Sequence, residues 1–294
     1  MNSARLKKTE GFTRLLSLTG LHVGLISLLG CQPVETESSK QQGFQTFNAQ
    51  QHMRVSMSLH YASKSLDCED TFVHGEHEWQ LERAALFSSD WQFLDSQTNT
   101  WHSIDLLQSG WQTQDVALLW FDQQCGSESE LPKNQNIDLD IPAERWQQAS
   151  QVRFTLAVPF ANNHLNPLTQ PSPLNMPEMF WSWQTGYKFI RFDMRTQSEQ
   201  LGSVGWSYHL GSIGCESASS MRPPKRPCNR PNRIQITLEK QSASKQLVFD
   251  IAALLDGIKP TSMASCMFHR DNENSCGILW SNINSGSVIR WQSD

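Results

Sequence analysis

The residues of this chain that could do chemistry gather around one aromatic segment. From Pro171 to Asp193 the sequence reads PSPLNMPEMFWSWQTGYKFIRFD, in which six residues are aromatic. Histidines stand on both sides of this segment, His164 before it and His209 after it. Imidazole binds metal ions well, whereas indole is a poor ligand because its nitrogen only donates hydrogen bonds. The segment is therefore either an aromatic core strand or a site at which a tryptophan takes part in chemistry.

Signatures of the common enzyme classes are not found in the sequence. It contains no GxSxG, no HExxH and no glycine-rich phosphate loop, and its Ser, Asp and Glu residues show no spacing that selects a nucleophile with its base or a pair of carboxylates. His74 and His77 have the spacing of two metal ligands, but the sequence offers no third ligand near them. We therefore predict that the protein is not an enzyme, with a hydrolase of unrecognised type as the less favoured alternative.

The first thirty residues have the composition of an export signal. Basic residues precede an apolar run from Leu15 to Gly30, which is too short and too interrupted for a membrane span. The run ends in LLGC and resembles the lipobox of bacterial lipoproteins, in which Cys31 would carry the lipid; an ordinary secretory signal is the alternative. Because Gln rather than Asp follows the cysteine, we expect an outer membrane lipoprotein that faces the periplasm or the cell surface.

The mature chain is expected to be a tether followed by one domain. Residues 31–51 are rich in Gln, Ser, Glu and Thr, as flexible tethers are, and residues 52–294 are enough to bury one substantial core. Residues 1–30 carry four basic side chains and one acidic side chain, so their removal lowers the formal net charge from -5 to -8. A net acidic chain argues against nucleic acid as the partner.

Six cysteines remain after Cys31, an even number that predicts disulfides in an exported protein. They are Cys68, Cys125, Cys215, Cys228, Cys266 and Cys276. Closeness in sequence favours Cys215 with Cys228 and Cys266 with Cys276, which leaves Cys68 for Cys125. The sequence does not prove these pairs, and a thiolate metal site is the alternative, although no CxxC spacing supports it.

Short stretches of alternating apolar and polar residues recur along the domain, as in β-strands. They are Met53–His60, Val116–Phe121, Gln151–Val158, Lys188–Met194, Arg233–Leu238, Gln246–Ile251 and Ser287–Trp291. Long amphipathic helices are not apparent, and only Glu144–Ser150 and Ile251–Leu255 suggest short helical turns. The pattern predicts an all-β domain, an antiparallel β-sandwich with long loops that is stapled by disulfides.

The loop Met221–Arg233 combines several basic side chains with four prolines. A solvated surface is the ordinary interpretation of such a loop. The more specific hypothesis is that Arg226, Arg230 and their neighbours dock an acidic electron-transfer partner.

Three uncommon sequence motifs, in a fixed order, resemble those of a known family. They are NNHLNPLTQPSPLNMPEMFWSWQTGYKFIRFD, GWSYHLGSIGC and CNRPNRIQITL. Together they resemble the methanobactin-operon copper proteins, called MbnP-like and also the four-Cys member of the metallo-mystery pair. The resemblance is strong from Gln151 to about Cys276 and looser from Met53 to Asp140. Six cysteines rather than four depart from the pattern.

The resemblance implies a copper protein whose site contains an oxidised tryptophan. Its ligands would be His164 and His209, together with Trp183 or Trp181 after a partner dihaem, peroxidase-like (MbnH-like) enzyme has converted one of them to kynurenine. Ring opening would create an aniline nitrogen and a ketone oxygen, and such a low-coordinate site favours Cu(I). Structural roles for either histidine, a core role for one tryptophan and a further ligand at His60 stay open.

The sequence as a whole therefore predicts a copper-binding lipoprotein that acts in copper acquisition or handling. The alternative from another class is a carbohydrate-binding or adhesive surface lipoprotein, which would use some of the eleven tryptophans as exposed stacking platforms. The two predictions differ in whether the tryptophans are exposed or converge with the histidines.

Overall fold

The computed structural model describes residues 52–67, 70–121, 132–196, 204–240, 245–261, 264–268 and 273–292, with side chains from 275 in the last range. The predicted export signal, the predicted lipidation site Cys31, the predicted tether and the pair Cys68 and Cys125 lie outside these residues. Among the described residues, no helix is both long and apolar enough to cross a membrane.

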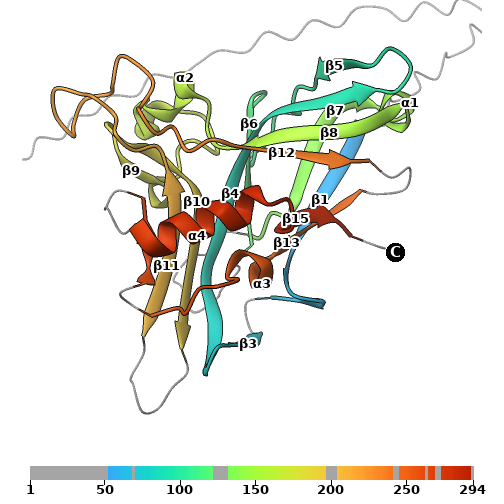
Figure 1. Cartoon of the computed structure of the whole chain (residues 1–294). Coiled ribbons are helices and arrows are strands. Elements are labelled where there is room, and N and C mark those ends of the chain that lie inside the picture. Colours follow the sequence, from blue (N-terminus) through green and yellow to red (C-terminus); the bar gives the residue numbers. More distant parts are fainter. Residues whose placement is uncertain are drawn as a thin grey trace, which may run out of the picture. The chain divides into compact units, whose positions relative to one another are not determined.

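A five-stranded sheet brings together residues from both ends of the described chain (Figure 1). Its central strand β1 (His52–Tyr61) pairs in parallel with β13 (Gln246–Asp250) and antiparallel with β2 (Lys64–Ser65) and β7 (Asn136–Pro142). The strand β15 (Ile289–Trp291) pairs with the other side of β13.

A larger, ten-stranded sheet is organised around β4 (His77–Asp95). The strands that pair with β4 are β3 (Thr71–His74), β5 (Thr100–Ser103), β6 (Val116–Trp120), β8 (Ala149–Leu156) and β10 (Gly186–Thr196). The sheet is extended by β12 (Ile234–Glu239) beside β8, by β9 (Phe180–Ser182) and β11 (Gly205–Gly211) beside β10, and by β14 (Cys266–Met267), which is parallel to β11.

The sequence patterns did not predict β4, although it is the longest strand. In its middle, Ala84 and Leu86 face the main core between the sheets, whereas Ala85 and Phe87 face a second apolar cluster on the other side. This short apolar run is followed by Ser88, Ser89 and Asp90, which interrupt the alternation of the two ends of the strand. The predicted all-β sandwich is nevertheless confirmed, and each of the seven predicted stretches overlaps an observed strand.

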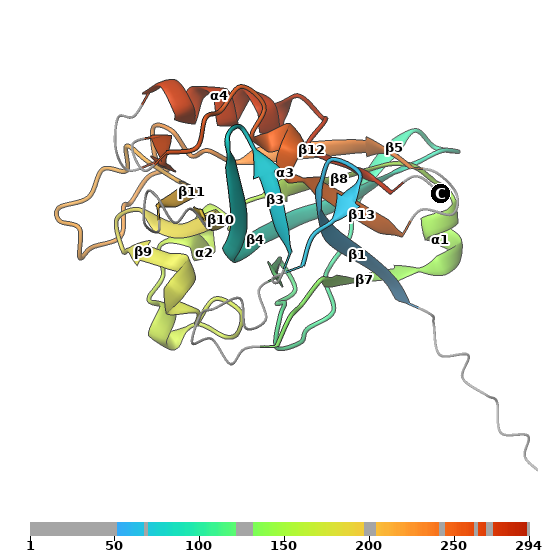
Figure 2. The ribbon, with the colours of Figure 1, turned by 90° about the horizontal axis from the view of Figure 1, so that it is seen from below.

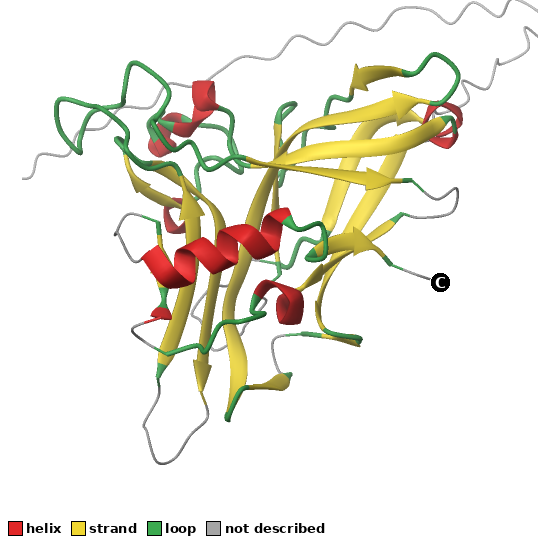
Figure 3. Ribbon diagram, viewed as in Figure 1, coloured by secondary structure: helices red, strands yellow, loops and turns green. Residues whose placement is uncertain are grey.

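The helices are short, except for one. They are α1 (Ala143–Gln147), α2 (Phe160–Asn163), α3 (Ile251–Leu254), α4 (Glu273–Asn284) and the 3-10 turns η1 (Pro167–Thr169) and η2 (Pro177–Met179). Figure 3 shows α4 lying across one face of the larger sheet. Its apolar side is the triplet Cys276, Leu279 and Ile283, all buried.

Disulfides close two of the C-terminal loops. Cys215 pairs with Cys228 and Cys266 pairs with Cys276, as their closeness in sequence suggested. The second bridge joins β14 to α4. In Figures 1 and 2, the strands β9 and β11 lie at the end of the domain away from β7 and α1.

Candidate metal centre

His209 lies on β11 within a network of hydrogen bonds to Asp193 on β10. The antiparallel register places Arg191 opposite His209 and Asp193 opposite Ser207. Asp193 Oδ1 accepts from Nε2–H of His209 and from the hydroxyl of Ser207, both at 2.7 Å, while Asp193 Oδ2 accepts from Arg191 Nε at 2.7 Å. Because residues two apart share a face of a strand, two neighbouring strands gather all four side chains.

These contacts determine which atoms of the pair carry protons. Burial alone raises the pKa of Asp193, but the hydrogen bond from His209, the charge of Arg191 and the Ser207 hydroxyl outweigh burial and hold the pKa far below its usual range. Burial lowers the pKa of His209, although Asp193 opposes this shift. Asp193 is therefore a carboxylate and His209 a neutral imidazole, whose single proton lies on Nε2, the nitrogen that faces the carboxylate.

The other ring nitrogen of His209, Nδ1, has no hydrogen-bond partner among the described residues. His209 is only 7% exposed, and its Nδ1 is itself buried. In the tautomer that Asp193 favours, this nitrogen carries a free lone pair. A buried lone pair that makes no hydrogen bond costs free energy unless another group uses it. Coordination of a metal ion is one such use.

Trp181 lies against His209, as expected for one of the two candidate tryptophans. The ring centroids are 6.3 Å apart, with an angle of 50° between the ring planes. The indole rests on the backbone of Gly211, two residues after His209, where an added Cβ would lie 2.7 Å from Trp181 Cζ3 and 2.7 Å from the carbonyl oxygen of Tyr187. Glycine at this position therefore allows the indole to approach the backbone of β11 beside the imidazole.

His164 lies close to the aromatic segment but faces a different group. Its Nδ1 donates to the backbone carbonyl of Trp183 at 3.2 Å, so that Nε2 accepts from the amide of Asn163 at 3.1 Å. Burial lowers the pKa of His164, while the bond to the Trp183 carbonyl raises it. His164 is therefore neutral, and a metal at Nε2 would have to replace the Asn163 amide.

Asn163 fixes the histidine loop to the start of β10. Its Oδ1 accepts from the backbone N–H of Tyr187, and its side-chain nitrogen lies 3.5 Å from Ser212 Oγ, just beyond β11. A Cβ on Gly186 would come within 2.6 Å of Asn163. The Asn163-His164 pair is thus held between β10 and the end of β11.

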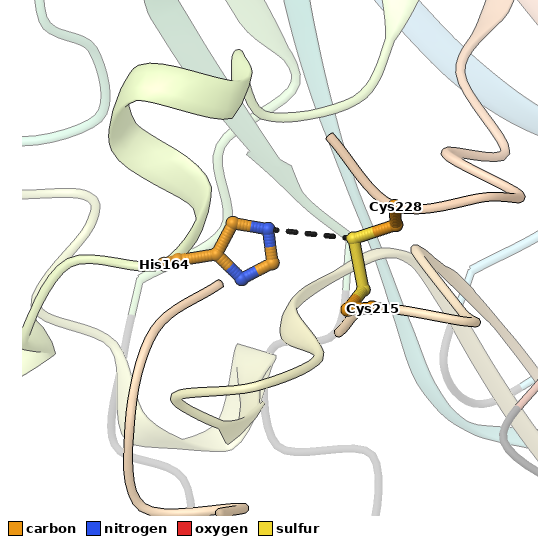
Figure 4. A group of neighbouring side chains, drawn as sticks. All are labelled: His164, Cys215 and Cys228. Atoms are coloured by element: carbon orange, nitrogen blue, oxygen red, sulfur yellow. Dashed lines mark hydrogen bonds between the residues drawn. A yellow bond between two sulfur atoms is a disulfide. The ribbon is translucent and has the colours of Figure 1, made fainter. Parts of the chain in front are cut away.

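A cluster of metal-ligating residue types surrounds His164, as Figure 4 shows. The nearest ligand atoms of His164, Cys215 and Cys228 lie within 4.8 Å of one another, and His164 Nε2 is 3.7 Å from Cys228 Sγ. Both sulfurs are joined in a disulfide, however, and so offer no thiolate. Among the described residues, the structure therefore gives no support to the alternative of a thiolate metal site.

Other candidate histidines have structural surroundings. His74 and His77 face each other across the hairpin between β3 and β4, and both ring nitrogens of His74 are occupied, by the Tyr61 hydroxyl at 3.0 Å and the Ile258 carbonyl at 2.9 Å. His60 is buried in β1 of the five-stranded sheet, and its charged neighbours are in β13 and β15 rather than in the network of His209.

The tryptophans do not form exposed platforms. Six of the eleven are buried and the other five, which include Trp181 and Trp183, are partly buried. Stacking on sugars requires an accessible indole face. The alternative of a carbohydrate-binding protein therefore lacks the feature on which it depended.

The sequence predicted His209 and Trp181 as site residues, and the structure places them in contact; the sequence did not point to Asp193, Ser207 and Arg191. The available signal was that polar residues stand two apart in each segment, Arg191 and Asp193 in RFD and Ser207 and His209 in SYH, so that each pair shares one face of a strand. Only the register of β10 against β11 shows that these two segments lie opposite each other.

The structure places Trp181 beside His209 and ties the His164 loop to the end of β11 through Asn163 and Ser212. A neutral imidazole with a free nitrogen, as on His209, suits a soft ion such as copper.

Comparisons with known proteins agree with the observed fold and with the sequence motifs. The model of the MbnP family matches residues 50–268. Among solved structures, MbnP from Methylosinus trichosporium matches with a TM-score of 0.63 and 20% identity, covering 78% of this chain and 87% of that one. The comparison with curated proteins finds no match.

Proposed function

Because the chain belongs to the MbnP family, we propose that it is a copper-binding protein that acts in copper acquisition or handling and has no catalytic activity of its own. The observation that carries this proposal is the buried Nδ1 of His209, which has no hydrogen-bond partner among the described residues and lies on a ring beside Trp181. His164 is the second imidazole of the proposed donor set. Copper is proposed as Cu(I), because two neutral imidazoles and one modified aromatic make a low-coordinate, soft site.

Trp181 is the tryptophan that we assign to oxidation to kynurenine. Its indole is in ring contact with His209, whereas the recorded link of Trp183 to the histidines is a backbone carbonyl. Ring opening would turn a side chain without a free lone pair into one with an aniline nitrogen and a ketone oxygen. In this proposal Trp183 positions His164 through its carbonyl and needs no modification.

A dihaem, peroxidase-like partner is proposed to carry out this oxidation. The basic loop offers a docking surface close to the tryptophans: Gln184, which follows Trp183, bonds through its backbone N–H to Ser220 O and through its side chain to Cys215 O. A cavity of about 430 Å³ lies in this loop, bordered by Arg222, Lys225 and Arg226. An acidic partner bound there would sit beside the Trp181–Gln184 segment.

The proposed setting is the outer membrane, reached through a lipid on Cys31. The resemblance of LLGC to a lipobox supports this proposal. A lipid anchor and tether would keep the copper site near the membrane while the domain remains in water.

Competition titration with a chromogenic Cu(I) chelator tests the function. The matured native chain should bind one equivalent of Cu(I), and His209→Gln and Trp181→Phe should each lose that binding. Trp183→Phe is the matched control, since it retains the backbone carbonyl and should bind normally. Equal binding by the native chain, His209→Gln and Trp181→Phe would contradict the proposal.

A further inference from the structure

The Asp193 carboxylate is surrounded by donors. Ser207 and His209 donate to Oδ1 and Arg191 donates to Oδ2. All four residues lie on β10 and β11, and only 14% of the Asp193 side chain is exposed. The carboxylate, which can only accept, therefore satisfies three fixed donors, and one of them is the imidazole of the proposed copper site.

We propose that Asp193 is the positioning residue of the site: it holds the proton of His209 on Nε2 and so keeps Nδ1 free as the metal-binding atom. The inference rests on the proposed copper function and extends it to a residue outside the proposed donor set. Histidine ligands of metals commonly donate their second N–H to a carboxylate, which fixes both the tautomer and the ring orientation.

The hydrogen bonds that an asparagine could make in place of Asp193 explain why the proposal requires a carboxylate. An asparagine has one accepting oxygen and one donating nitrogen, so one end of its amide must face a donor. Arg191 cannot accept a hydrogen bond, which favours placing the amide nitrogen toward Ser207 and His209. His209 can accept from that nitrogen only by moving its proton to Nδ1, and this blocks the atom that would bind copper.

The test measures the tautomer directly in ¹⁵N-labelled protein without copper. Long-range ¹H–¹⁵N correlation spectra should show Nε2–H for His209 in the native chain and a shift toward Nδ1–H in Asp193→Asn. Cu(I) affinity of Asp193→Asn should fall by about 10–100-fold, as for other partners of metal ligands. A matched control is Asp250→Asn, another buried aspartate, which caps α3 and should change neither readout.

A second variant separates positioning from folding. Near-ultraviolet circular dichroism of the aromatic core reports whether Asp193→Asn is folded. In the double variant Asp193→Asn/Arg191→Gln, the new glutamine oxygen can accept from the asparagine nitrogen, so the asparagine oxygen can face His209 again. The double variant should therefore regain the Nε2–H tautomer and most of the Cu(I) affinity.

The two proposals can fail separately. Absence of Cu(I) binding by the native chain would contradict the copper function, while the tautomer spectra would still decide the role of Asp193. Either of two results would overturn that role: a native His209 protonated on Nδ1, or a folded Asp193→Asn with unchanged tautomer and affinity. Failure of the double variant to regain the Nε2–H tautomer would also count against it.

Discussion

At the scale of single residues, the site depends on two positions where a strand leaves room for a neighbour. Gly211 gives space to the indole of Trp181, and Gly186 gives space to Asn163. Trp181 belongs to the proposed copper site, and Asn163 precedes its second proposed ligand, His164. The aromatic segment therefore combines structural and functional roles: Tyr187 and Phe189 are fully buried core residues, while Trp181 lies at the site.

Gly211→Ala should displace the indole and destabilise the domain. The new Cβ would meet both Trp181 and the fixed carbonyl of Tyr187 at 2.7 Å. Overpacking of this kind costs about 1–3 kcal/mol, which urea unfolding can measure. Gly277→Ala in α4 is the control, because its Cβ meets nothing within 4 Å, and alanine should stabilise the helix by about 1 kcal/mol. Equal stability of Gly211→Ala and the native chain would show that Trp181 does not rest there.

Because of the environment of Lys188, we expect the free energy of unfolding to rise in alkaline solution. Burial, with the charge of Arg191, lowers the pKa of Lys188 to about 8 from its ordinary 10.5. Between these values the unfolded chain binds more protons than the folded chain, so the free energy of unfolding should increase with pH from about 8 to 10.5, by up to about 3 kcal/mol. Lys188→Met should lose this increase and the exposed Lys64→Met should keep it. A pH profile shared by all three proteins would refute the assignment.

At the scale of elements, short stretches of apolar residues predicted seven of the strands, including β6, whose residues are all buried. They did not predict β4, in which Ser88, Ser89 and Asp90 interrupt the pattern, nor α4, whose sequence ENSCGILWSNIN contains glycine and three asparagines. Packing of Leu279 and Ile283 and the Cys266–Cys276 bridge stabilise α4 in place of helix propensity.

The Cys266–Cys276 bridge should therefore be important for α4. Replacement of both cysteines by serine should lower the free energy of unfolding by about 3 kcal/mol through the released loop. Hydrogen exchange should show faster exchange in α4 than in β4. Unchanged protection of α4 would mean that packing alone holds the helix.

The same limit applies to the site. The sequence motifs that contain His164, Trp181 and His209 were recognisable, but the pairing of Asp193 with His209 depends on the register of two strands. The sequence also could not distinguish Trp181 from Trp183, because the distinction comes from contact with β11.

At the scale of the whole molecule, an acidic chain presents a local basic surface beside the site. Arg222, Lys225 and Arg226 are exposed on the loop that Cys215 and Cys228 close. Reversal of Arg222 and Arg226 to Glu should slow association with the proposed dihaem partner at low salt, and added salt should reduce the difference from the native chain. Reversal of Arg54, which lies on β1, is the control. Equal association rates would exclude the loop as the docking surface.

The central claim, that Trp181 is converted into a copper ligand beside His209, can be tested by one measurement. It is peptide mass spectrometry of the chain purified from its native host under copper-replete conditions with the partner enzyme present. Our account predicts a gain of about 4 Da on Trp181, the change from tryptophan to kynurenine, and an unmodified Trp183. An unmodified Trp181, or the same gain on Trp183 instead, would contradict it.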